Sequence, residues 1–259
     1  DLYMHRYLSL LFFIGFVFWS FQNTSKTIDQ NNILRVMSYN TLYTNFPSAG
    51  GNDKKMKLIG DNIINMNPTV LGTQETQDKL LLDQYTNGLL TLVPDTDFQN
   101  PIYYNPNKVS LETSGWFSIP SDDYSSRTFT YANFKLDSIS FWLFNTHMPH
   151  KHGEAGAINT HANIAQILLE KRSELGANGT PTVIIGDFNT FASDGDPLGS
   201  FENNIVNGGD FTKSYQAMHW GIDKIFHSTE HWTAVNGYDG PFGGSDHTPI
   251  LVELTLASH

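Results

Sequence analysis

The segment Thr182–Thr190, which reads TVIIGDFNT, predicts the core of the fold. Its run Val183–Ile185 is apolar and β-branched without a polar break, which is typical of a strand buried on both faces. Gly186 ends the run, and Asp187 and Asn189 follow at once. A carboxylate and an amide on such a loop either form the turn or are held rigidly for chemistry. Both interpretations fit this segment alone, so the other strand ends must decide between them.

The composition indicates one globular domain rich in sheet. The 259 residues contain no linker rich in Pro or Ser and no internal repeat. Aromatic residues are abundant (18 Phe, 11 Tyr and 5 Trp) and only 16% of residues are charged, which argues against disorder. The net charge of −11 argues against a protein that coats nucleic acid. A bound cation would offset acids where a phosphate binds, although net charge alone also fits a simple effect on solubility.

The chain has no cysteine. This excludes disulfides, thiolate zinc sites, iron–sulfur clusters and a cysteine nucleophile. Any metal ion must therefore be bound by Asp, Glu, Asn or His, and such ligands suit Mg²⁺, Mn²⁺ or Ca²⁺.

The segment Leu8–Phe21 (LSLLFFIGFVFWSF) is almost wholly apolar. It is short for a membrane span of about 20 residues and has the length of the apolar part of a signal peptide. We therefore expect residues 1–25 to be a signal peptide or, if uncleaved, a membrane anchor, with a core helix as the third alternative. The protein would be secreted or would face the cell exterior, and residues 33–256 would form its domain.

The first predicted β-α-β unit delivers two polar residues to one sheet edge. Ile33–Tyr39 alternates like a strand and ends at Asn40. Lys54–Asn67 places apolar residues on one helical face, and the short strand Thr69–Thr73 ends just before Glu75. Because parallel strands finish at the same edge of a sheet, we expect Asn40 and Glu75 to lie there together.

The remaining segments predict a layered fold. Expected strands cover Ile102–Tyr104, Val109–Phe117, Thr128–Leu136, Ile139–Asn145, Gly221–His227 and Thr248–Leu256. Expected helices cover Lys79–Tyr85, Gly156–Leu175 and, as a short helix or turn, Ser200–Val206. Short connections make the middle strands antiparallel. The pattern predicts an α/β (α+β) fold, a sandwich of two packed sheets flanked by helices.

Polar side chains gather at the predicted strand ends. They are Asn40, Glu75, His147, Asp187, Asn189, Asp223, Asp246 and His247. Each has a local structural explanation, such as a cap, a solvated acid or a core histidine. Asp223 lies within an apolar strand and needs a partner there, for which His247 is a natural candidate. A shared site explains the whole set better than separate accidents do.

Six segments carry these residues: LRVMSYN (34–40), TQE (73–75), NTH (145–147), GDFN (186–189), IDKIF (222–226) and SDHTPI (245–250). They resemble the successive motifs of the endonuclease/exonuclease/phosphatase superfamily, the DNase I-like metal-dependent phosphoesterases. One motif alone is weakly specific, but all six in this order are highly specific, and the resemblance runs from Leu34 to Leu254. It implies a four-layer sandwich of two packed mixed β-sheets, with the site at one edge.

The resemblance implies a metal site. Glu75 would be the main ligand of a catalytic Mg²⁺, with Mn²⁺ or Ca²⁺ as alternatives, and Asn40 would help to place it. Asp246 would lie near the metal or just behind its ligands. Arg127, in SSRTFTYANF, lies where many members carry an Arg that contacts phosphate, but an exposed Arg on a hairpin explains it equally well.

The resemblance also implies roles in the reaction. Asp187 would orient or deprotonate the attacking water, and Asn189 would bind the phosphate and stabilise the transition state. Asp223 and His247 would form an Asp–His pair, and His147 would protonate or position the phosphate. Independently of the family, phosphodiester hydrolysis needs charge neutralisation, an in-line water and a protonated leaving group. A hard cation, a carboxylate and a histidine supply these.

The expected function is a divalent-metal-dependent hydrolase of phosphodiester or phosphomonoester bonds. Inositol polyphosphate phosphatases of the family typically carry Cys-Asp-Arg where this chain has Gly221–Lys224 (GIDK), which counts against them. The leader counts against a nuclear repair enzyme and a cytoplasmic deadenylase. We expect a secreted nuclease or phosphodiesterase with nucleic acid as its substrate. A sphingomyelinase-like enzyme acting on phospholipid is the alternative, and a non-catalytic binding module is a weaker one. No protein partner is predicted, and a monomer is expected.

Overall fold

The computed structural model describes residues 33–257, apart from residues 98, 122–125, 150–154, 191–196 and 207–209. The predicted leader, residues 1–25, lies outside the described residues. Among the helices that are described, none is both long and apolar enough to cross a membrane.

The segment TVIIGD forms strand β8 (Thr182–Asp187), and every residue of it is buried. Val183 and Ile185 face an apolar core between two sheets, whereas Ile184 faces a second core beneath helix α3 (Ala155–Glu174). Successive side chains of a strand point to opposite faces, so this alternation buries both faces of β8. The predicted strand is confirmed.

The strands in the described part of the chain form two six-stranded sheets. Sheet A has the order β11 (Trp232–Asp239), β12 (Ile250–Leu256), β1 (Leu34–Asn40), β2 (Val70–Gln74), β4 (Ile102–Tyr104) and β3 (Thr91–Leu92). Sheet B has the order β5 (Ser110–Ile119), β6 (Arg127–Leu136), β7 (Ile139–His147), β8, β10 (Asp223–Ser228) and β9 (Phe211–Gln216). The pairs β1–β2 and β7–β8 are parallel and the others are antiparallel, so both sheets are mixed.

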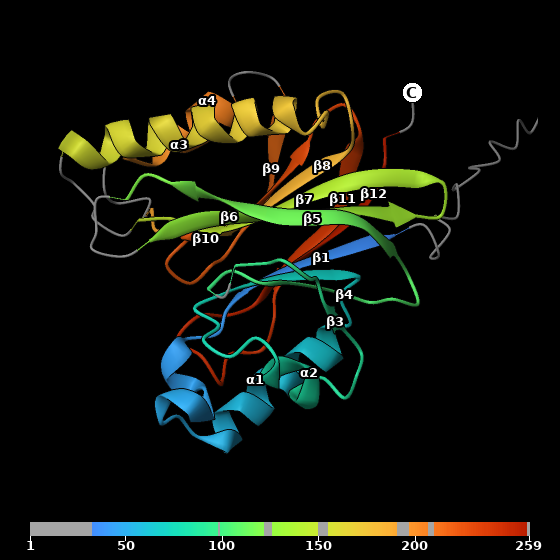
Figure 1. The fold of residues 1–259 in the computed structure, drawn as a ribbon, viewed down its shortest axis with the longest axis vertical. Coiled ribbons are helices and arrows are strands. Elements are labelled where there is room, and N and C mark those ends of the chain that lie inside the picture. Colours follow the sequence, from blue (N-terminus) through green and yellow to red (C-terminus); the bar gives the residue numbers. More distant parts are fainter. Residues whose placement is uncertain are drawn as a thin grey trace, which may run out of the picture.

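Helices cover the outer face of each sheet (Figure 1). Helices α1 (Asp53–Met66) and α2 (Leu81–Tyr85) lie against sheet A, whereas α3 and α4 (Pro197–Val206) lie against sheet B. The short 3₁₀ helices η2 (Tyr43–Asn45) and η3 (Pro47–Ala49) connect β1 to α1.

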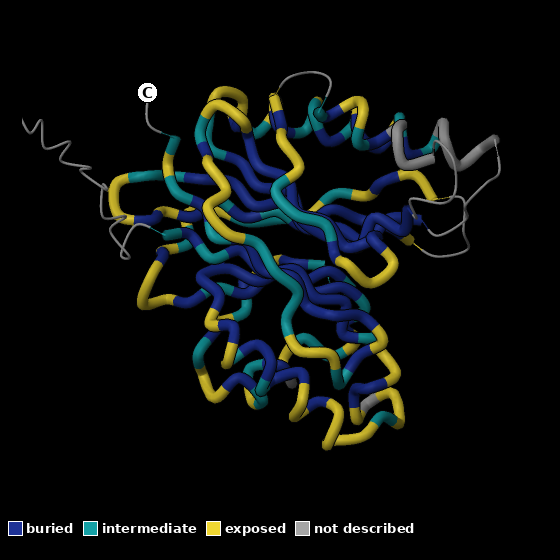
Figure 2. The backbone as a smooth tube through the Cα atoms, turned by 180° about the vertical axis from the view of Figure 1, so that it is seen from behind, coloured by how far each residue is buried: buried dark blue, intermediate teal, exposed yellow. Residues whose placement is uncertain are grey.

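The apolar side chains form one core between the sheets and one core beneath each helical layer. Figure 2 shows that the buried segments of the backbone concentrate in the two sheets. Side chains thus fill the space between each pair of neighbouring layers, as a sandwich requires. The predicted four-layer sandwich of packed mixed sheets is confirmed.

Strands β3, β9 and β11 were not predicted, and all three lie at a sheet edge. An edge strand buries little of its surface and tolerates polar residues, so its apolar alternation is weak. Strand β11 also contains Asn236-Gly237, a dipeptide typical of a hairpin turn. The strand instead continues through this dipeptide with a bulge between Ala234 and Asn236.

Candidate active site

Strand ends bring the predicted residues to one edge of the sandwich. In sheet A, β1 ends at Asn40, level with the end of β2, and Glu75 follows β2 directly. In sheet B, His147 at the end of β7 pairs with Asp187 at the end of β8. Asp187 in turn pairs with Asp223, the first residue of β10. The parallel pairs β1–β2 and β7–β8 therefore deliver polar residues from both sheets to a common edge.

The Asp187 carboxylate lies at the centre of this group. Asn40 Nδ2 donates to Asp187 Oδ2 (3.0 Å) and to Glu75 Oε1 (3.0 Å), so one amide joins acids from the two sheets. Two imidazoles approach the same Asp187 oxygen, with His147 Nε2 at 3.6 Å and His247 Nε2 at 3.8 Å. Groups from two strands, β1 and β7, and from the loop before β12 thus converge on one carboxylate oxygen.

Asp187 is ionised at neutral pH although it is buried. Burial raises the pKa of this carboxyl, but His147, His247 and hydrogen bonds from Asn40 and Asn189 lower it, and the net shift is downward. The Asn189 backbone N–H donates to Asp187 Oδ1 at 2.9 Å. An ionised carboxylate is the state needed to orient a water molecule or to accept its proton.

Asp223 and His247 form a buried pair, with His247 Nδ1 2.7 Å from Asp223 Oδ2. Burial lowers the pKa of His247, but the facing carboxylates of Asp223 and Asp187 raise it to about 9. Burial raises the pKa of Asp223 to about 6, against the lowering effect of His247. Between these values His247 is an imidazolium. Its Nδ1–H donates to Asp223, which leaves its Nε2–H directed toward Asp187.

The loops that carry these residues are held in unusual conformations. Glu75 has φ 54° and Asn189 has φ 49°, both in the left-handed region, and such residues cluster at functional sites. Asn189 Nδ2 donates to the Met148 carbonyl at 2.8 Å, which ties the loop after β8 to the loop after β7. Ser245 Oγ donates to the Asn40 carbonyl at 2.8 Å and so fixes the loop before β12.

The side chains around Glu75 fit a hard divalent cation. Carboxylate oxygens of Glu75 and Asp187 share one amide donor, which concentrates negative charge in a small volume. Such cations prefer carboxylate and amide oxygens as ligands. Asn40 presents its nitrogen to Glu75, while its Oδ1 accepts from the Leu42 N–H at 3.0 Å. In this orientation Asn40 positions the carboxylate, and coordination by its oxygen would require the amide to rotate.

A second set of potential metal ligands overlaps the first. Asp187, Asp223 and His247 each place one ligand atom within 4.8 Å of the others. The hydrogen bond between His247 and Asp223 already uses two groups of this set, and both oxygens of Asp187 accept hydrogen bonds, so Glu75 offers the more open carboxylate. Asp246 is exposed beside them and raises the pKa of His247, which places its charge near the pair.

Arg127 begins β6 and is 7% exposed. Phe129 pairs with Thr146, so Arg127 lies at the same end of sheet B as His147. The alternative of an exposed hairpin arginine is wrong, because the residue is buried at the edge that carries the site.

A buried polar network that the sequence did not reveal joins the two sheets behind the site. Gln74 Nε2 donates to Asn145 Oδ1 at 2.7 Å, and Asn145 Nδ2 lies 2.9 Å from the Thr73 carbonyl. The sheets approach closely here, since a Cβ on Gly72 would lie 2.5 Å from the Asn145 side chain. Gln74 belongs to the TQE motif and Asn145 to the NTH motif. Their closeness in sequence to Glu75 and His147 is the feature from which the network could have been predicted.

Lys224 is a second residue of the site region that the sequence did not single out. Lys224 is 1% exposed, and its ammonium donates at 3.1 Å to Oγ1 of Thr190, the residue directly after Asn189. Burial lowers the pKa of Lys224 to about 8, although Glu202 at 3.5 Å opposes the shift. The sequence feature that could have revealed Lys224 is its place inside the apolar strand IDKIF, because a buried lysine needs a partner.

Exposed aromatic residues border the site. The Trp220 ring meets the His247 ring edge-on at 5.3 Å, and the His219 ring lies tilted against Trp220 with centroids 4.4 Å apart. Phe242, 69% exposed, lies 6.1 Å from His219, and Met218 in the same loop is 83% exposed. We call Met218, His219, Trp220 and Phe242 the aromatic rim. It offers apolar surface to a ring or chain that flanks the reacting phosphate.

Comparisons with known proteins identify the family and the fold. The profile of the Endonuclease/Exonuclease/phosphatase family matches residues 37–247. No curated protein sequence matches the chain. An endonuclease/exonuclease/phosphatase family protein from Bacteroides thetaiotaomicron shares 22% identity over 87% of this chain and 98% of its own, with a TM-score of 0.68.

A Bacteroides vulgatus family protein is 20% identical over 87% of this chain and 99% of its own, with a TM-score of 0.69. The catalytic domain of human Nocturnin, solved with bound sulfate, is 14% identical over 87% of this chain and 94% of its own, with a TM-score of 0.69. These structures share the fold, and the matched profile covers every predicted site residue from Asn40 to His247. The chain therefore belongs to the endonuclease/exonuclease/phosphatase family and has its DNase I-like hydrolase fold.

Proposed function

We propose that the protein is a divalent-metal-dependent hydrolase that cleaves phosphodiester bonds by in-line attack of water. One observation carries the proposal. The ionised Asp187 carboxylate lies beside the imidazoles of His147 and His247 and shares the Asn40 amide with Glu75. A base, two proton donors and a carboxylate ligand thus surround a single position at the sheet edge.

Each side chain then has a task in the reaction. Asp187 orients the attacking water and accepts its proton. His247, held as an imidazolium by Asp223, donates its Nε2–H to a phosphate oxygen and stabilises the charge that develops there. His147 binds the phosphate from the other side of Asp187.

Two polar residues complete the binding of the phosphate. Arg127, at the same edge, adds a guanidinium for the phosphate. One Nδ2–H of Asn189 donates to the Met148 carbonyl, and the other binds a phosphate oxygen. A Mg²⁺ ion held by Glu75, with Asp246 beside it, supplies charge neutralisation when bound, and Mn²⁺ or Ca²⁺ are alternatives.

Nucleic acid is the proposed substrate class. The aromatic rim beside His247 suits a base that stacks next to the scissile phosphate. The same exposed apolar surface favours a second candidate, a phospholipid whose headgroup enters the site while the rim contacts the membrane. We further propose that residues 1–25 direct the protein to the cell exterior, as a cleaved signal or as an anchor.

The experiment measures hydrolysis of plasmid DNA, RNA, sphingomyelin and a bis-aryl phosphodiester by protein lacking residues 1–25. Each reaction is run with Mg²⁺ and with excess EDTA, beside the variant Asp187→Ala. Metal-dependent cleavage of nucleic acid that the variant loses would establish the nuclease. Cleavage confined to sphingomyelin would select the lipid candidate, and no cleavage of any substrate with Mg²⁺ or Mn²⁺ would contradict the proposed reaction.

A further inference from the structure

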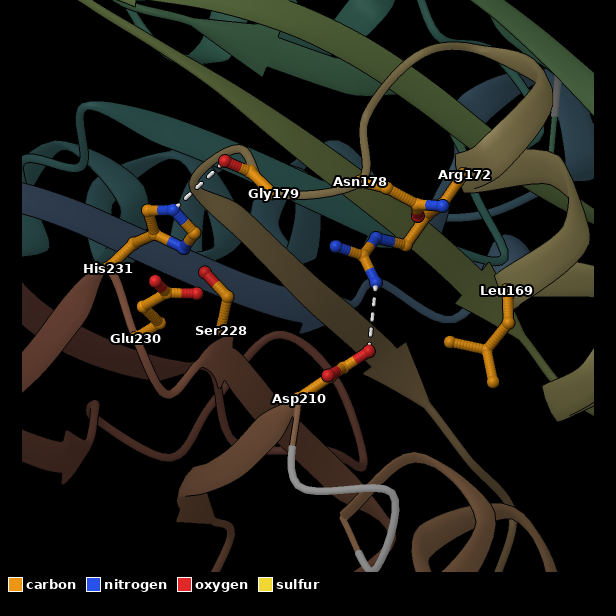
Figure 3. A pocket seen from close by; sticks show the side chains of 8 residues that line it. All are labelled: Leu169, Arg172, Asn178, Gly179, Asp210, Ser228, Glu230 and His231. Carbon is orange, nitrogen blue, oxygen red and sulfur yellow. Dashed lines mark hydrogen bonds and ion pairs between the residues drawn. The ribbon is translucent and has the colours of Figure 1, made fainter.

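A polar pocket lies at the far end of sheet B from the active site. It has a volume of about 410 Å³, within the usual range for small-ligand sites. It lies among the last turns of α3, the loop after it, the residue before β9, the end of β10 and the loop after β10 (Figure 3). Its lining consists of Leu169, Arg172, Asn178, Gly179, Asp210, Ser228, Glu230 and His231.

The distance to the active site follows from the strand geometry. Ser228 is the last residue of β10, whereas the active-site residue Asp223 is the first. Five residues of extended chain separate them by about 17 Å. Thr182, the first residue of β8, donates its N–H to Ser228 Oγ at 3.0 Å, so β8 and β10 both connect this pocket to the opposite edge.

Arg172 is the unusual residue of the pocket, since it is 4% exposed and has few partners. Its guanidinium lies 4.6 Å from the ring centroid of Phe211. Its Nη2 donates a long hydrogen bond of 3.4 Å to the Ala177 carbonyl, and its Nη1 lies 3.9 Å from Asp210 Oδ2. Its Nε has no partner among the described residues. A guanidinium carries five N–H donors, so most of its hydrogen-bonding capacity is unused.

A buried cation with so few partners is costly. Asp210 offsets only a small part of this cost, because its side chain is 67% exposed and lies beyond hydrogen-bonding distance of the guanidinium. Burial lowers the pKa of Arg172, and Asp210 opposes this shift only in part. An oxyanion that accepts two N–H groups through two of its oxygens would satisfy the guanidinium better than Asp210 does.

The other polar groups of the pocket suit hydroxyl groups. His231 Nε2 lies 3.1 Å from the Gly179 carbonyl and donates its proton there, which leaves Nδ1 as an acceptor. That Nδ1 has no partner in the described part of the chain. Ser228, Asn178 and Glu230 add further donors and acceptors around the same space (Figure 3).

We propose that this pocket binds a small hydroxylated anion, such as a sugar phosphate, whose anionic group pairs with Arg172 in place of Asp210. The ligand's hydroxyl groups bind His231, Asn178 and Glu230. The exposed Asp210 side chain turns toward solvent when the anion enters. The site is separate from the active site and does not depend on the function proposed for it.

The test follows the side-chain resonances of His231 by NMR while inorganic phosphate or ribose 5-phosphate is added in EDTA. His231 belongs to this pocket, so its response is distinct from binding at the active site. We expect saturable shifts, tighter with ribose 5-phosphate than with phosphate. The variant Asp210→Asn removes the competing charge about 4 Å away and should tighten binding about fivefold. The variant Arg172→Gln should abolish the shifts.

The variant Asp61→Asn, on α1 under sheet A, is the matched control because it changes the net charge equally at a distant surface. It should leave binding as in the unmodified protein. Unmoved His231 resonances, or equal affinities in Asp210→Asn and Asp61→Asn, would overturn the proposal even if Arg172→Gln failed to fold. A response to glucose equal to that to ribose 5-phosphate would also overturn it, since the anion would then have no part in binding.

Discussion

The two ends of strands β8 and β10 hold buried charge in opposite ways. At one end, Asp187 and Asp223 are surrounded by close imidazole and amide donors, with Glu75 nearby. At the other end, Arg172 has one long hydrogen bond and one distant carboxylate. The first end has an excess of acids and the second an underpaired cation. The comparison teaches that the two ends of the same strands suit ligands of opposite charge, a metal cation under the proposed function and an anion under the proposed second site.

The largest expected effect removes the base at the acidic end. Asp187→Asn keeps the size of the side chain but cannot accept a proton, so the hydrolysis rate should fall about 10²–10⁴-fold. Initial rates with Mg²⁺ measure the loss, and circular dichroism checks the fold. Asp61→Asn, at a half-exposed acid on α1 that pairs with Lys57, is the control and should hydrolyse normally. A variant at position 187 with near-normal rates would remove Asp187 from the mechanism.

The second prediction compares Arg172 with an arginine that is fully paired. Arg35 pairs with Glu253 and donates to the Met66 and Asn67 carbonyls and to the Tyr238 hydroxyl. Arg35→Met should lower the free energy of unfolding by about 2–4 kcal/mol, because it leaves the partly buried Glu253 carboxylate without its charge partner. Arg172→Met should cost less than about 1 kcal/mol in the absence of ligand.

Urea denaturation of both variants measures this difference. Equal losses would show that the few contacts of Arg172 already satisfy it. The contrast between the two ends of the strands would then lose its basis.

The third prediction concerns Lys224, a buried cation on the acidic side that does have partners. Its pKa in the folded protein is about 8, below the ordinary 10.5, so between these values the unfolded chain binds more protons. The free energy of unfolding should therefore rise with pH across this window, by up to about 3 kcal/mol from this group. Below pH 8 the group's cost is present in full.

Lys224→Met removes this contribution, so the difference between the two proteins should change from pH 8 to 10.5. Urea denaturation at several pH values measures it. Lys57→Met is the matched control, since that lysine lies on the surface of α1 and should leave the pH dependence unchanged. A difference that stays constant with pH would mean that Lys224 titrates normally.

The smallest effect is stabilisation by the metal itself. A divalent cation at a hundred times its dissociation constant should stabilise the protein by about 2.7 kcal/mol. Mg²⁺ should therefore raise the melting temperature, and Glu75→Gln should abolish most of the rise. Glu112→Gln, an exposed acid on β5, should keep the full rise. Equal stabilisation of both variants would place the metal away from Glu75.

The sequence predicts the acidic end well, because its residues directly follow buried apolar strands whose pattern is clear. Asp187 after TVIIG and Glu75 after the second strand are examples. Edge strands such as β9 and β11 escape prediction, since half-exposed residues carry little apolar alternation. Arg172 escapes too, because an arginine in the last turn of a helix ordinarily points to solvent. Its burial against Phe211 depends on a strand that was itself not predicted.

The Asn40 amide links an acid of sheet A to an acid of sheet B. The active site therefore does not exist in either sheet alone, however completely that sheet has formed. During refolding, circular dichroism reports the formation of strands and helices, whereas hydrolysis begins only after the sheets have docked and Gln74 has met Asn145. The rate at which activity returns during refolding therefore measures the rate at which the two sheets dock.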